Sequence, residues 1–152
     1  MSVIGKGRAY TMNIAEQLDD EVRLNSIRDI LNGDLIDAGL QQTILADLGG
    51  NIIAQYDSGE VIYDSASLAV LAASNIGSLN AMSKLLGEGD FPLFILKGES
   101  DNIHFNKVTD DLFLIAIFSQ ELSIGFVRNK VDKAISGLKS LIAHCSAMSV
   151  AD

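Results

Sequence analysis

The sequence predicts an α+β fold in the element order α-β-β-α-β-β-β-α, a sandwich in which helices cover both faces of one five-stranded, mostly antiparallel sheet. Three observations predict it. Three long stretches have apolar residues at helical spacing, and five short apolar runs lie between turn residues. One of these runs, Leu112–Phe118, is apolar on both faces, so it belongs at the centre of a sheet that is covered on both sides.

Length and composition indicate one domain. The chain has 152 residues and a mass of 16.2 kDa, with 48% hydrophobic and 20% charged residues, which argues against disorder. Residues 1–18 contain Gly5 and Gly7 but no apolar periodicity, so we expect a flexible tail there. The domain then spans residues 19–147, and residues 148–152 form a short C-terminal tail.

The first helix and the first hairpin follow this tail. Leu24, Ile27 and Leu31 have helical spacing, the acidic run 19–21 suits a first helical turn, and Asn32-Gly33 suits a helix end. Strands are expected at 43–48 and 52–56, because these apolar runs flank the tight-turn sequence Gly49-Gly50-Asn51.

A long helix over 65–86, capped by Asp64 or Ser65, has two apolar faces. The larger residues Leu68, Leu71, Ala72, Leu79, Met82 and Leu86 share one side, together with Asn75. The small residues of the other side form a candidate interface with a partner: Ala66, Ala69, Val70, Ala73, Gly77 and Ala81. The alternative is a central helix that is buried twice within one domain. Asn75 is either a buried, hydrogen-bonded residue or a sign that its face is not fully covered.

Three strands and a helix complete the chain. The strands are expected at 91–97, 102–108 and 112–118, with turns at 100–102 and 109–111, and the last helix at 123–144. Pro92 cannot donate a backbone hydrogen bond, so the strand 91–97 begins there or lies at an edge of the sheet.

Charge and residue chemistry exclude several classes of function. The net charge of −9 and the lack of a basic cluster argue against nucleic acid, and no apolar run is long enough to span a membrane. One cysteine and no recognisable secretory signal indicate the cytoplasm.

His144 and Cys145 are sequence neighbours whose side chains diverge on a helix. His104 is a lone histidine in a predicted strand, and such a residue is more often exposed or hydrogen-bonded than a metal ligand. We therefore expect no catalytic residue, cofactor or metal, and no enzyme.

The chain resembles the Roadblock/dynein light chain superfamily, and within it the bacterial MglB-like regulators of a Ras-like GTPase. The resemblance covers residues 19–144. It rests on three stretches of residue classes, which are TILADLGGNIIAQYD, SLAVLAASNIGSLNAMSKLLGEGDF and KGESDNIHFNKVTDDLFLIAIFSQELSIGFVRNKVDKA.

The resemblance implies a homodimer whose long helices lie side by side and whose sheets join through an edge strand. That strand would be 91–97, with Phe91, Leu93 and Ile95 at the dimer edge. It also implies a regulator or scaffold that binds a small Ras-like GTPase at the helix surface and modulates its GTP cycle without donating catalytic chemistry. A structural dimerising adaptor and, less favoured by the aliphatic composition, a small-ligand sensor remain as alternatives.

Overall fold

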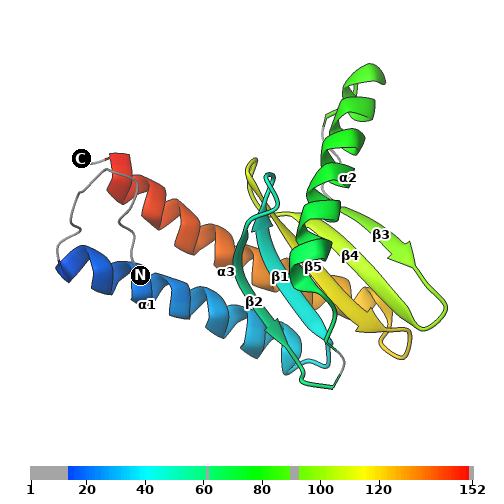
Figure 1. The fold of residues 1–152 in the computed structure, drawn as a ribbon, viewed down its shortest axis with the longest axis horizontal. Helices are drawn as coiled ribbons and strands as arrows, with labels where there is room; N and C mark the ends of the chain where they lie inside the picture. Colours follow the sequence, from blue (N-terminus) through cyan, green and yellow to red (C-terminus); the bar gives the residue numbers. More distant parts are fainter. Residues whose placement is uncertain (1–13, 61, 90–92, 151–152) are drawn as a thin grey trace.

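The computed structural model describes residues 14–60, 62–89 and 93–150, and the statements below refer to these residues. Their elements, shown in Figure 1, are α1 (Ile14–Ile30), the π-helix η1 (Leu31–Ile36), β1 (Gln42–Asp47), β2 (Ile52–Asp57), α2 (Ser65–Leu85), β3 (Leu93–Lys97), β4 (Asp101–Lys107), β5 (Leu112–Ser119) and α3 (Ile124–Val150). The order and type of these elements confirm the α+β prediction.

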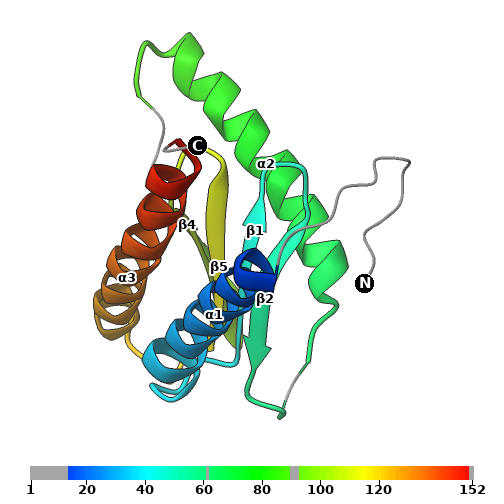
Figure 2. The same cartoon turned by 90° about the vertical axis from the view of Figure 1, so that its left-hand side faces the viewer.

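The five strands form one antiparallel sheet in the order β2-β1-β5-β4-β3. β5 is the middle strand, as its two apolar faces predict. Helices α1 and α3 lie on one face of the sheet and α2 lies on the other (Figure 2). β2 and β3 are the two edges, so the position predicted for the strand around Pro92 is confirmed for its described part, 93–97.

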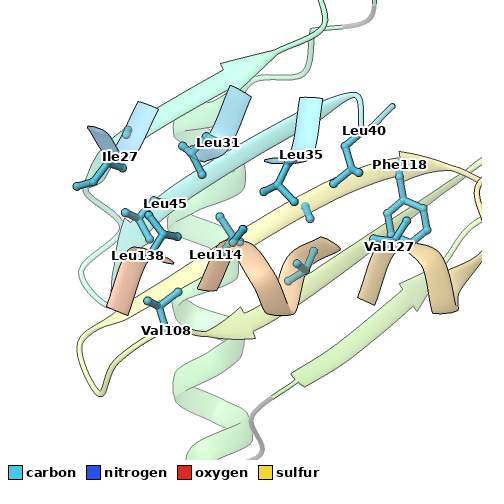
Figure 3. Close-up of a cluster of buried hydrophobic side chains, with 14 residues drawn as sticks. Ile27, Leu31, Leu35, Leu40, Leu45, Val108, Leu114, Phe118, Val127 and Leu138 are labelled. Atoms are coloured by element: carbon cyan, nitrogen blue, oxygen red, sulfur yellow. The ribbon is translucent and has the colours of Figure 1, made fainter. Parts of the chain in front are cut away.

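The larger core lies between the sheet and the α1–α3 layer, where leucine side chains from both layers interlock (Figure 3). Leu31 and Leu35 of η1 meet Leu45 and Leu114 of the sheet, and Leu138 of α3 closes the cluster. All five side chains are fully buried. Burial of a leucine contributes roughly 1.5–3 kcal/mol, so this layer supplies much of the driving force for folding.

The smaller core lies under α2. Ile44, Phe113, Ile115 and Ile117 fill the sheet side, and the buried residues of the helix that face them are Ala69, Ala72 and Ala73, with Leu68 and Ile76 partly buried beside them. Because the sheet side chains are bulky, the alanines at the centre of the contact allow the backbone of α2 to approach closely.

Two predicted helix boundaries are wrong. α1 begins at Ile14, so residues 14–18 of the predicted tail are helical, and the acidic run 19–21 lies inside the helix rather than at its start. The reason is local, since residues 15–18 are Ala, Glu, Gln and Leu, all strong helix formers. α3 continues to Val150, into the predicted C-terminal tail, because neither Gly nor Pro follows Gly137 to end it.

The predicted helix end at Asn32-Gly33 is also wrong. The chain continues there as η1, in which the Asp37 N–H donates to the carbonyl of Asn32 at 2.8 Å. The turn ends at Gly39, which has a φ of +111°. Burial of Leu31 and Leu35 outweighs the low helix propensity of Gly33, which costs about 1 kcal/mol.

The β1–β2 hairpin has the predicted turn. The Asp47 carboxylate accepts hydrogen bonds from the N–H groups of Asn51 at 2.8 Å and Gly49 at 3.0 Å. These bonds, above all those from Asn51, lower the pKa of Asp47. Gly50 has a φ of +87° and lies directly beneath α2, because a Cβ added there would be 3.0 Å from the Cα of Val70.

Gly50→Ala is therefore expected to lower the free energy of unfolding by about 2–4 kcal/mol, through backbone strain and a clash with α2 together. Gly59→Ala is the matched control, because Gly59 has a φ of +84° but open space around its Cβ position. In Gly59→Ala, backbone strain alone is expected to lower the free energy of unfolding by about 1–2 kcal/mol. Urea unfolding of the two variants checks this, and equal losses would show that α2 does not press on the hairpin.

Candidate partner interface

Helix α2 packs on the sheet through only part of its length. Ala69, Ala72 and Ala73 of its first half are buried, whereas the second half extends past the end of the sheet (Figures 1 and 2). Ser83 is the buried residue of this second half, and its hydroxyl donates to the carbonyl of Glu88 at 3.3 Å and to that of Gly89. The far end of α2 is thus held by its own exit segment and not by the sheet.

The base of α2 is fixed by polar contacts. The Gln42 side chain accepts a hydrogen bond from the Tyr63 N–H at 2.8 Å and donates to the Ser65 hydroxyl at 2.7 Å. The Tyr63 hydroxyl donates to the Asp101 carboxylate, and this bond raises the pKa of Tyr63. The Asp64 carboxylate accepts from the Ser67 N–H at 3.2 Å, so Asp64 is the cap, one of the two predicted candidates. These contacts fix the direction in which α2 leaves the sheet.

Large apolar side chains are exposed on α2. Leu71 is 68% exposed and Leu85 is 87% exposed, and others of this kind are Val70 and Met82, with Leu86 at the C-cap of the helix. A helix that lay only on its own domain would direct such residues inward. Exposed leucines in this number on one helix indicate a surface that binds another chain.

Leu71 belongs to a groove of about 470 Å³ between α2 and the β3 side of the sheet. Leu68, Leu71 and Asn75 form the helix wall, and Leu96 of β3 with Ile103 of β4 form the floor. Leu96 is 49% exposed. The groove is continuous with the open edge of β3, so the apolar surface and the free strand edge form one site.

The structure divides the small-residue stripe that periodicity predicts as an interface. Ala69 and Ala73 are buried against the sheet and are not free to meet a partner, whereas Ala66, Val70, Gly77 and Ala81 are at least partly exposed. Leu71 and Met82, predicted on the side of the larger residues, are exposed as well. Asn75 is exposed, so the second alternative for that residue holds, and its helix face is not fully covered within this chain.

Two of the three residues predicted at the dimer edge, Leu93 and Ile95, lie in β3. Ile95 is partly buried and pairs with His104, so its side chain lies on the face of the sheet that carries α3. Leu93 is the first residue of β3, and Phe91 lies outside the described residues. The edge residue that faces the groove is Leu96.

His104 is a buried polar residue that the sequence did not predict. It is fully buried, its ring meets that of Phe118 edge-on at 4.8 Å, and neither ring nitrogen has a hydrogen-bond partner among the described residues. Burial, and to a lesser extent the charge of Arg128, lowers its pKa to about 4. His104 is therefore a neutral core residue, and the expectation of an exposed or hydrogen-bonded side chain is wrong.

Within residues 14–60, 62–89 and 93–150, no three His, Cys, Asp or Glu side chains converge as a metal site would require. The helices in these ranges include none that is long and apolar enough to cross a membrane. Arg23 forms an ion pair with Asp20 at 3.0 Å on α1, and Arg28 and Arg128 also lie on helices.

A five-stranded antiparallel sheet with α2 on one face and α1 and α3 on the other is the fold of the Roadblock/LC7 domains. A Roadblock/LC7 domain from Streptomyces avermitilis has this fold, with a TM-score of 0.62 and 11% identity over 69% of this chain and 87% of that one. The chain belongs to the MglB family: it is 30% identical to Myxococcus xanthus MglB over 80% of its length and 96% of that protein, with a TM-score of 0.71.

A second MglB structure supports the fold. The gliding protein MglB of Thermus thermophilus has a TM-score of 0.67 and 19% identity, over 90% of this chain and 97% of that one. No family profile matches the sequence, and no curated protein matches it.

Proposed function

We propose that this protein is a homodimeric regulator that binds a small Ras-like GTPase and modulates its GTP cycle. The observation that carries the proposal is the 30% identity to MglB over nearly the whole of that protein. The exposed half of α2 supports it, because a helix that projects beyond its own sheet needs another chain to cover its apolar residues.

The dimer that we propose joins the two β3 edges into one continuous sheet. Pairing β3 with its copy satisfies the free backbone groups of this edge strand. It also brings the two grooves together, so Leu71 and Leu96 of each protomer are covered. The exposed residues of the small stripe, Ala66, Val70, Gly77 and Ala81, form a second candidate surface for the partner helix or the GTPase.

Regulation by docking fits this chain better than a donated catalytic arginine. The arginines that the structure describes lie on helices, and Arg23 is engaged by Asp20. An arginine that enters a GTPase site comes from a segment that can reach into it. We therefore propose that binding holds the catalytic residues of the GTPase in place, and that the chain itself is not an enzyme.

The test is GTP turnover by the Ras-like GTPase of the same organism, measured with and without this protein, together with co-purification of the pair. We expect turnover to rise at least roughly tenfold, against the roughly 10³–10⁵-fold that a donated arginine supplies. Arg8→Ala, Arg23→Ala, Arg28→Ala and Arg128→Ala should each retain the stimulation, and a collapse of GTP turnover with any one of them would overturn regulation by docking. Binding without stimulation would leave a scaffold, and no binding would favour the dimerising adaptor or the ligand sensor.

A further inference from the structure

The open edge of β3 presents backbone donors and acceptors at every second residue. Where the β3–β4 hairpin closes, the Gly98 N–H donates to the carbonyl of Asp101 at 3.0 Å. Along an antiparallel pair, hydrogen-bonded and non-hydrogen-bonded pairs of residues alternate. Leu96 is therefore bonded to β4, whereas Ile95 and Lys97 are not. The N–H and C=O groups of Ile95 and Lys97 point away from β4, towards the open edge.

The far side of β4 agrees with this assignment. The Gln120 N–H donates to the carbonyl of Ser100 at 2.9 Å, so the β4 residues at every second position from Ser100 are bonded to β5. These residues include Asn102 and His104, and their backbone groups point away from β3. Two hydrogen bonds on different strands thus give the same alternation, and it extends along β3 to Leu93.

We propose that a second copy of the chain pairs with this edge in one register, which is centred on Ile95. This register rests on the homodimer proposed above and specifies how its two β3 strands meet. In a two-fold dimer, Ile95 then lies opposite the partner's Ile95, Leu96 lies opposite the partner's Phe94, and Lys97 lies opposite the partner's Leu93.

The register centred on Ile95 uses every outward backbone group of β3. Leu93, Ile95 and Lys97 each meet an outward residue of the other strand, so their N–H and C=O groups are all bonded. A register centred one position later sets Leu93 opposite Glu99, in the turn after β3. One centred a position earlier sets Lys97 opposite residue 91, before the first residue of β3. A backbone group left unbonded in an interface costs about as much as a lost hydrogen bond.

Charge and side-chain cover favour the same register. Like charges directly opposite each other destabilise a strand pair, and here the two Lys97 residues lie at opposite ends of the paired segment. Leu96 is 49% exposed in the single chain and faces the groove. It falls in a non-hydrogen-bonded pair, which is the type that brings opposite side chains closest, so the partner strand covers it.

Disulfide trapping tests the register, in the full chain with Cys145→Ser as the background. Residues of a non-hydrogen-bonded pair have Cα atoms about 4.5 Å apart, and a disulfide needs about 4.4–6.8 Å. The double variant Phe94→Cys/Leu96→Cys should therefore become a covalent dimer on mild oxidation. Phe94→Cys or Leu96→Cys alone should not, because the two copies of either position are diagonal neighbours about 7–8 Å apart. A co-refolded mixture of the two single variants supplies the same pair with one substitution per chain.

Lys97→Cys is the matched control on the same strand, and it should not cross-link because its two copies lie four positions apart. Sedimentation equilibrium of the parent and of the reduced variants shows separately whether the dimer exists. A dimer that is trapped by Leu96→Cys alone, by Phe94→Cys alone or by Lys97→Cys overturns the register but keeps the dimer. A dimer that neither the double variant nor the mixture traps does the same. A parent chain that is monomeric overturns the homodimer of the proposed function, and the register with it.

Discussion

Leu71→Glu is expected to convert the proposed dimer into a folded monomer. Leu71 is 68% exposed in the single chain, so a glutamate there meets water and leaves the fold intact. In the proposed dimer the same position is covered by the second protomer beside Leu96. Burial of an unpaired carboxylate costs several kcal/mol, and at about 1.4 kcal/mol per factor of ten the association constant falls by at least roughly 100-fold.

Sedimentation equilibrium at micromolar concentration measures this effect, and circular dichroism checks that the fold is kept. Gly77→Leu is the matched variant on the small-residue stripe, where an added side chain finds open space in the single chain. A dimer through the groove tolerates Gly77→Leu and fails with Leu71→Glu. The reverse result would assign the interface to the small stripe, and a parent chain that is monomeric at all concentrations would remove the dimer altogether.

The fold could be predicted from the sequence because its signals are local. The two apolar faces of Leu112–Phe118 require cover on both sides, and β5 is the central strand. The glycine turn at 49–51 marks the first hairpin, and the Asp64 cap marks the start of α2. Each of these signals depends on residues a few positions apart, so no knowledge of the tertiary packing is needed.

The candidate site was harder to predict, because periodicity shows that α2 has two apolar faces but not which one meets the sheet. The face with the larger residues packs on the sheet in part, through Ala72 and the partly buried Leu68. The sheet also covers Ala69 and Ala73 of the small-residue stripe, and it leaves Leu71 exposed. The prediction of the helix ends was wrong for a related reason. At Gly33 the local propensity is outweighed by burial of side chains against residues that lie far away in the sequence.

Polar residues of the core gave no sequence signal. In the sequence, Gln42 and His104 look like ordinary strand residues. Only the register of the sheet shows that Gln42 fixes the base of α2 and that the side chain of His104 enters the core. A buried polar side chain without a hydrogen-bond partner lowers the stability of the fold, so it is seldom kept for stability. His104 therefore allows a quantitative test of the packing.

His104→Leu is expected to stabilise the protein and to remove part of its acid sensitivity. In the folded chain the pKa of His104 is lowered from 6.5 to about 4. Between these values the unfolded chain binds a proton that the folded chain does not, so stability falls as the pH drops from 6.5 towards 4. At about 1.4 kcal/mol per pKa unit, the loss between pH 7 and pH 5 is about 2 kcal/mol.

Leucine has a similar volume and no polar atom, so it removes two unpartnered nitrogens as well as the proton-linked loss. Urea unfolding of the parent and the variant at pH 7 and pH 5 separates the two effects. We expect a gain of about 1–2 kcal/mol at pH 7 and a gain about 2 kcal/mol larger at pH 5. The carboxylates titrate in both proteins, so their contribution cancels in the difference. If the variant loses as much stability as the parent on acidification, the His104 imidazole takes up its proton in the folded state. A charged imidazole requires a hydrogen-bond acceptor beside it, and the surroundings of His104 would then be looser than its burial indicates.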